Sequence, residues 1–207
     1  MKRLVITFLF AVACLGLNVQ AQTTATPQTK QGDETNLETQ LYLIVGTNQE
    51  VADAKLPSSL DAVVKQMRAS LPFKNYRLAS TLINRVKNDG RLDLNWIGGP
   101  LATSNVSATA PAPSFSYFKV RQVSLVQNSE GQSLVQMLGF NFGTRIPIQT
   151  GAFASADKAF PQINYEGTGL ATDISMREGD PVVVGTLNVG PSGDAIILVV
   201  SAKRTQK

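Results

Sequence analysis

Few residues in this sequence could do acid–base or nucleophilic chemistry, because it contains no histidine. Histidine is the usual proton carrier near neutral pH and the usual base beside a catalytic serine or cysteine. Glu178 and Asp180 flank Gly179 and form one pair of carboxylates. Acidic residues in a turn are usually solvated, so this pair does not indicate a general acid and base. The sequence therefore predicts no catalytic residue.

The other charged candidates lie within runs that alternate between polar and apolar residues. Asp173 lies between Thr172 and Ile174, and its position leaves open a side chain in water or one at a subunit contact. Arg121, Arg145 and Arg177 are expected to be rim residues or ion-pair partners.

The glycine-rich segments and the cysteine content predict neither a cofactor nor a metal. Gly167-Thr168-Gly169 lacks the third glycine and the strand-to-helix setting of a dinucleotide site, which favours a turn or bulge. Residues 190–193 lack the lysine of a phosphate loop and are typical of a hairpin turn. A single cysteine can form neither an intrachain disulfide nor a ligand cluster. The protein is expected not to be an enzyme.

The N-terminus has the pattern of a secretory signal peptide. Lys2 and Arg3 precede an apolar run over residues 4–17, which is shorter than the ~20 residues of a membrane-spanning helix. The small residues before position 22 place cleavage between Ala21 and Gln22, so residues 1–21 are the expected signal. Two alternatives stay open: an uncleaved N-terminal anchor, and lipid attachment at Cys14.

The expected export and the resulting net charge indicate where the protein is located and which class of partner it does not bind. Loss of residues 1–21 removes two basic residues, which lowers the net charge from +4 to +2. The chain has no run of five or more basic residues, so no nucleic-acid partner is expected. We expect the protein in the periplasm or at the outer membrane, with membrane contact left open.

The N-terminal half predicts a small α+β unit over residues 39–97, after a flexible leader over residues 22–38. Residues 39–47 alternate as a strand. Residues 57–71 predict a helix that opens with a Ser58/Asp61 capping box and has an apolar stripe at helical spacing. Residues 73–87 and 90–97 predict two strands paired through the turn Asn88-Asp89-Gly90.

The C-terminal half, residues 115–207, predicts an antiparallel β-sheet domain after a Gly/Ala/Pro/Ser-rich linker over residues 98–114. Runs 115–127, 133–149, 163–176, 182–189 and 195–203 alternate as strands, with a loop over residues 151–161. The last two runs are apolar on both faces, so a second layer of the chain or a neighbouring subunit must cover them twice. The expected fold class is α+β.

Part of this β half resembles the β-domain of secretins, the ring proteins of type II and III secretion and of type IV pili. The shared motifs are GTRIPIQTG over residues 143–151 and a strand over residues 163–176 in which Tyr165, Gly169 and Leu170 match the family's spacing. An acidic turn and a VVVG strand follow over residues 178–187, before a closing apolar strand over residues 195–202. The match is reduced and partial.

The resemblance implies an exported, non-enzymatic envelope protein, a structural or accessory component related to a secretion or pilus secretin. It also implies self-association or binding to other envelope secretion or pilus proteins, through exposed sheet edges. A soluble periplasmic binding module with no secretion role is the alternative, and a hydrolase using carboxylates or Ser/Lys is a third reading.

Overall fold

The structure is a computed structural model, and it describes residues 35–50, 56–98, 112–155, 158–189 and 193–205. All of these residues belong to one compact unit, residues 33–207. The expected cleavage between Ala21 and Gln22, Cys14 and most of the leader lie outside the described residues, as do residues 99–111 of the expected linker.

Strands account for most of the described chain. In chain order the elements are β1 (Asn36–Thr47), the short 3-10 helix η1 (Ser58–Leu60), α2 (Asp61–Ser70), β2 (Asn75–Lys87), β3 (Gly90–Gly98), β4 (Ser114–Gln127), β5 (Ser133–Ser155), β6 (Lys158–Arg177), β7 (Val182–Val189) and β8 (Asp194–Arg204). Neither described helix has the length and apolar composition needed to cross a membrane.

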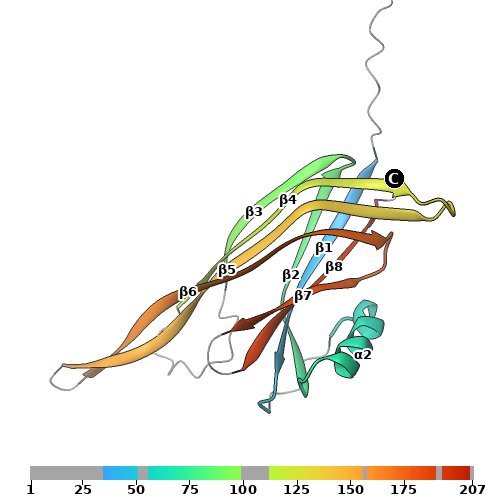
Figure 1. The fold of residues 1–207 in the computed structure, drawn as a ribbon. Coiled ribbons are helices and arrows are strands. Elements are labelled where there is room, and N and C mark those ends of the chain that lie inside the picture. Colours follow the sequence, from blue (N-terminus) through green and yellow to red (C-terminus); the bar gives the residue numbers. More distant parts are fainter. Residues whose placement is uncertain (1–34, 51–55, 99–111, 156–157, 190–192, 206–207) are drawn as a thin grey trace, which may run out of the picture. The chain divides into compact units, whose positions relative to one another are not determined.

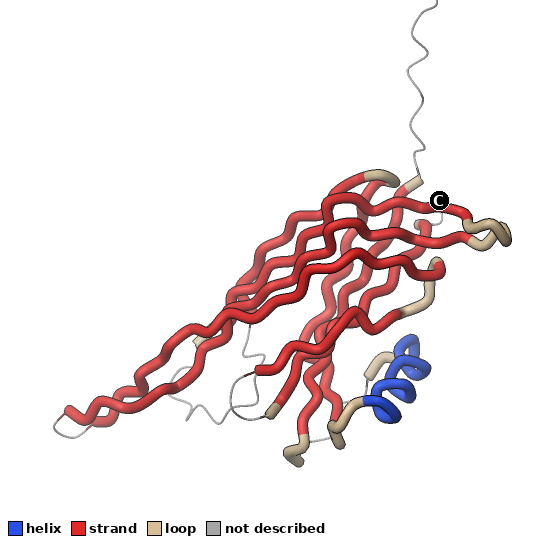
Figure 2. The backbone as a smooth tube through the Cα atoms, viewed as in Figure 1, coloured by secondary structure: helices blue, strands red, loops and turns tan. Residues whose placement is uncertain are grey.

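The strands form two four-stranded antiparallel sheets (Figure 1). Sheet A has the order β2-β1-β8-β7, and sheet B has the order β3-β4-β5-β6. The turn after β2 leads from an edge of sheet A to an edge of sheet B, and the turn after β6 leads back to the other edge of sheet A. Figure 2 shows the two layers of strands with the single α-helix on one side.

The core lies between the two sheets, because alternate residues of facing strands are apolar. Sheet A contributes Leu41, Leu43 and Leu198, and sheet B contributes Phe118 and Phe142, all at most 1% exposed. The rings of Phe118 and Phe140 lie 5.2 Å apart by their centroids. This alternation follows the pattern predicted for residues 39–47 and 115–127.

The second face of sheet A is also covered, by α2. Tyr42 and Ile44 of β1 and Ile197 of β8 pack with Val63 and Met67 of the helix. The central strand β8 is therefore buried on both faces, as its two-sided apolar sequence required. A second layer of the same chain supplies this cover, and the sequence had left that solution open beside a neighbouring subunit.

The expected α+β fold class is wrong. β1 pairs with β8 over ten residue pairs, so the first and last strands are neighbours in one sheet. β3 pairs with β4 in the other sheet. Both sheets thus combine strands from before and after residues 98–114, and no separate N-terminal α+β unit exists in the described chain. The class is a two-sheet antiparallel β-fold with one covering helix.

The turn at Asn88-Asp89-Gly90 is present, but the strands that it joins are not paired with each other in the described chain. β2 pairs with β1 and β3 with β4. The backbone N–H of Asn88 donates to Thr35, and that of Asp89 donates to Val123 of β4. These bonds hold the turn as a corner between the sheets, so the predicted β2–β3 pairing is wrong.

Two further local predictions need correction. The helix begins without a side-chain cap, so the expected Ser58/Asp61 capping box is not formed. Most of the expected loop over residues 151–161 is strand: β5 and β6 remain paired from Gly151 to Ser155, while residues 156–157 lie outside the described residues. Pro147 lies within β5 opposite Tyr165. Gly139 has a φ of 64° at a register shift of the sheet, which marks a bulge in β5.

Candidate functional site

The carboxylate pair of the turn after β6 has a structural role. Both oxygens of Glu178 accept hydrogen bonds from the Arg204 guanidinium, at 2.8–3.1 Å, and one also accepts from the Arg204 backbone N–H. These hydrogen bonds lower the pKa of Glu178 below its usual value. The arrangement fastens the end of β8 to the β6–β7 turn, and Asp180 lies exposed beside it.

Asp173 lies on an exposed face and accepts a hydrogen bond from the backbone N–H of Gly139. Gly139 is the bulged residue of β5, and a bulge leaves a backbone donor without its ladder partner. Asp173 supplies that partner, which gives this carboxylate a structural explanation.

The three arginines do not converge on one site. Arg145 lies over the ring of Tyr165, 5.9 Å from its centroid. Arg121 lines a separate hollow beside Gly139, and Arg177 ends β6 in an exposed position. In the part of the chain that the structure describes, no three histidine, cysteine or acidic residues lie close enough to hold a metal.

The two glycine motifs have different surroundings. Gly167 and Gly169 lie in the middle of β6, paired with Arg145 and Gly143, so the expected turn or bulge at this motif is wrong. Gly193 has a φ of 74° at the β7–β8 connection, as a hairpin turn requires, while residues 190–192 lie outside the described residues.

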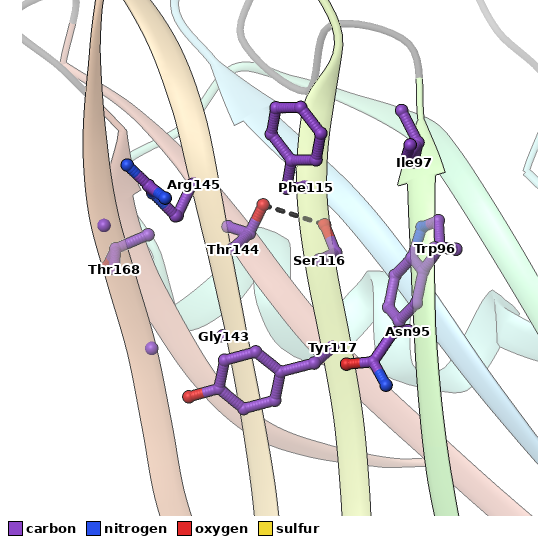
Figure 3. Close-up of a pocket in the computed structure, with 12 residues that line it drawn as sticks. Asn95, Trp96, Ile97, Phe115, Ser116, Tyr117, Gly143, Thr144, Arg145 and Thr168 are labelled. Carbon is purple, nitrogen blue, oxygen red and sulfur yellow. Dashed lines mark hydrogen bonds between the residues drawn. The ribbon is translucent and has the colours of Figure 1, made fainter.

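The best candidate site is a hollow on the outer face of sheet B, the face turned away from sheet A (Figure 3). We call it the outer-face hollow, and its volume is about 540 Å³. Three consecutive residues from each of four strands line it: 95–97 of β3, 115–117 of β4, 143–145 of β5 and 167–169 of β6. This volume falls within the range of small-molecule sites.

Aromatic and apolar side chains stand on this face. Ile97 is 68% exposed, Phe115 41% and Tyr117 37%. The rings of Phe115 and Tyr165 contact each other at 5.5 Å between centroids. Such exposed apolar groups in one area are typical of a contact or binding surface.

Glycines form the base of the hollow. The ring of Tyr117 lies against Gly143, where any β-carbon would collide with it. Gly167 has open space above it, because no atom lies within 4 Å of the place that a β-carbon would take. The absence of a side chain at Gly167 gives the hollow its depth and exposes the sheet backbone there, whereas the Tyr117 ring covers the backbone of Gly143.

Polar groups lie at the margins of the hollow. Asn95 and Arg145 carry the amide and the guanidinium that border it. Beneath it, the hydroxyls of Ser116 and Thr144 are hydrogen-bonded at 2.8 Å and buried, so they satisfy each other within the sheet. Asn95 and Arg145 are therefore two polar groups available to a ligand, beside the hydroxyl-bearing Tyr117 and Thr168 of the lining.

A second, shallower hollow of about 370 Å³ lies farther along the same face. Arg121, Gly139, Asn141 and Asp173 are among the residues that line it. Lys119, between the two hollows on β4, forms an ion pair of 3.2 Å with Asp93 of β3.

Sequence reasoning named Arg145, Arg121 and Asp173 but missed the outer-face hollow. The signal was the alternation of residues 115–121, which sets Phe115, Tyr117, Lys119 and Arg121 on one face. Two aromatic rings on the same face as two cations indicate a face that is not core.

Comparison with known proteins gives one kind of match. No protein-family model and no curated protein matches the chain. Among solved structures it is similar to InvG, the secretin of the Salmonella SPI-1 type III secretion injectisome.

One InvG structure matches at 10% identity with a TM-score of 0.33, covering 84% of this chain and 65% of that one. The InvG secretin-domain β-barrel matches at 11% identity with a TM-score of 0.35, covering 84% and 64%. InvG in the open gate state matches at 10% with a TM-score of 0.35, covering 99% and 66%. The chain thus spans just under two thirds of these InvG chains.

Proposed function

We propose that this protein is a non-enzymatic structural or accessory component of the cell envelope that assembles through the open edges of its sheets. The observation behind the proposal is that sheet B ends in two strands that each pair on one side only within the described chain, β3 and β6. β6 is 20 residues long. A long edge strand with free backbone groups is a template for pairing with another chain.

Strand direction favours pairing between copies of this chain. All neighbouring strands of sheet B are antiparallel, so β3 and β6 run in opposite directions. β6 of one copy could therefore pair with β3 of the next and continue the antiparallel pattern. This contact joins two different surfaces of the subunit, and such contacts close into rings when the rotation between copies allows it.

The ionisable groups of the described residues fit a role in assembly better than a role in catalysis. The two groups with shifted pKa values are Tyr76, where burial raises the pKa, and Glu178, where Arg204 lowers it. Tyr76 donates to the Met67 carbonyl and Glu178 accepts from Arg204, so each has a structural partner. The motifs that resemble secretins, within residues 143–187, lie in β5, the edge strand β6 and β7. They point to a role related to secretion or pilus secretins, in the periplasm or at the outer membrane.

Ile97 gives the test, because it is a 68% exposed isoleucine on the edge strand β3. Ile97→Lys places a charge beside the edge, which natural sheets use to prevent pairing. We expect wild-type protein to sediment as an oligomer and Ile97→Lys to shift to monomer with unchanged circular dichroism. Gln66→Lys, at an exposed position of α2, adds the same charge and should sediment as wild type. Equal sedimentation of all three proteins as monomers would contradict the proposal.

The outer-face hollow favours a second candidate, a soluble periplasmic binding module. Its volume and its mixture of aromatic and polar groups suit a small ligand. A protein that is monomeric in all conditions and binds a ligand at this hollow would support the second candidate over the first.

A further inference from the structure

We propose that the outer face of sheet B binds a linear oligosaccharide that carries carboxylates. This goes beyond the proposed assembly role, because edge pairing uses backbone groups in the plane of the sheet and leaves this face open. The binding surface comprises the outer-face hollow and the second hollow beside Gly139.

The two hollows lie along one line of the sheet. On β4 the outward residues are Phe115, Tyr117, Lys119 and Arg121. Phe115 lines the outer-face hollow, and Arg121 lines the second hollow. Six residues of strand span about 20 Å. A ligand that fills both hollows is therefore elongated along the strands, which suits a short polymer better than a single compact molecule.

The outer-face hollow suits a ligand made of flat rings. Phe115 and Tyr117 are each more than a third exposed, and bare backbone at Gly167 and Gly169 lies beside them. Aromatic side chains offer broad apolar surfaces with little conformational entropy to lose. The C–H face of a sugar ring can lie on such a surface while its hydroxyls reach the polar groups at the margin.

The charges on the surface select the ligand class. Arg145 and Arg121 form no ion pair among the described residues, whereas Lys119 is paired with Asp93. A guanidinium binds a carboxylate through two parallel hydrogen bonds. Asn95, Asn141 and the remaining carboxylate oxygen of Asp173 suit hydroxyl groups, so the surface combines a few carboxylate contacts with several hydroxyl contacts.

The same count of charges disfavours nucleic acid. A single strand carries one phosphate per nucleotide, and proteins that bind it line the path with many cations. This surface offers Arg121 and Arg145 for such contacts, and Asp173 lies close to Arg121 in the second hollow. A polymer with a phosphate on every unit would meet repulsion there, while a sugar polymer with only some charged units can place a neutral sugar, and its hydroxyl donors, beside Asp173.

The probe is a short, partly methyl-esterified oligogalacturonate, in which only some sugars carry a free carboxylate, with a cello-oligosaccharide of the same length as the neutral comparator and oligothymidylate as the nucleic-acid comparator. Trp96 is the single tryptophan of the chain, but its ring packs toward Phe142 of the core, so binding is measured by isothermal titration calorimetry instead of fluorescence. We expect oligogalacturonate to bind with a saturable heat signal, cello-oligosaccharide to bind more weakly, and oligothymidylate to give no heat of binding.

Two variants locate the site. Gly167→Leu fills the hollow, and its β-carbon has no atom within 4 Å, so the variant should abolish binding while the melting temperature is kept. Arg145→Gln should weaken oligogalacturonate binding by about tenfold, the loss of a charged hydrogen bond, and leave the neutral sugar unaffected. Arg85→Gln, an exposed arginine of β2 in sheet A, is the matched control and should bind as wild type.

Four results would overturn the proposal: no binding of oligogalacturonate to wild type, unchanged affinity in Gly167→Leu, equal losses in Arg145→Gln and Arg85→Gln, or tighter binding of oligothymidylate. A Gly167→Leu variant with a lower native mass would assign the face to contact between copies and also contradict it. Since the readouts are ligand affinity here and native mass for assembly, either claim can fail while the other holds.

Discussion

The ring of Tyr117 lies across Gly143 of the neighbouring strand, closer than any side chain at position 143 would allow. The two residues are direct partners in the β4–β5 register. The contact explains why a glycine occupies this place in a strand, where glycine normally lowers stability. It also fixes the position of Tyr117 at the base of the outer-face hollow.

Gly143→Ala should destabilise the protein by about 1–3 kcal/mol, because the added methyl group displaces the Tyr117 ring. In a Tyr117→Ala background the same change should cost close to nothing, since no ring opposes the methyl group. Chemical denaturation of the four proteins of this double-mutant cycle measures the coupling. Additive free energies of unfolding would show that Tyr117 does not occupy this place.

Leu198→Asp should abolish the folded state. Leu198 is 0% exposed in the central strand β8, within the core between the sheets. An unpaired charge there costs several kcal/mol, comparable with the roughly 5–15 kcal/mol stability of a typical domain. Ile83→Asp is the control, because Ile83 is 61% exposed and should keep its folded circular dichroism spectrum. A folded Leu198→Asp variant would mean that β8 is not a central strand.

The sequence predicted the positions of the strands well, but it did not predict which strands pair with each other. Alternation identified the runs that form strands, and it identified the two-sided burial of β8. It could not reveal that β1 lies between β2 and β8, because pairing between chain ends depends on which apolar faces fit together in three dimensions. The corner at Asn88-Asp89 has the residues of a hairpin turn, yet its backbone bonds go to Thr35 and Val123.

The outer-face hollow was harder to predict, since its shape arises from residues with no side chain. Gly143, Gly167 and Gly169 come together because of the register between β5 and β6. A glycine pair separated by one residue has no meaning in sequence until its strand and its partners are known. Local pattern reasoning therefore assigned residues 167–169 to a turn or bulge.

The Glu178–Arg204 interaction should make stability depend on acid pH. The pKa of Glu178 is lowered from its ordinary value of 4.5, so its stabilisation is present above that pH. It is lost as the pH falls below 4.5 through the folded-state pKa. Glu178→Gln should cost about 1 kcal/mol at pH 7, and the difference from wild type should shrink as the pH is lowered. Glu166→Gln, at an exposed glutamate of β6, is the control and should match wild type throughout.

Processing of the N-terminus gives an independent prediction. Protein exported by its host should begin at Gln22, with the peptide bond after Ala21 cleaved. Intact mass spectrometry measures this directly. An unprocessed Met1 or a lipid-modified Cys14 would instead attach the protein to a membrane and contradict the prediction.

The native mass of the wild-type protein, measured with and without mild detergent, is the most direct test of assembly through sheet edges. The account predicts a discrete multiple of the subunit mass, since pairing of β6 with β3 of the next copy continues until a ring closes. A single subunit mass in both conditions, over the whole accessible range of protein concentration, would contradict it.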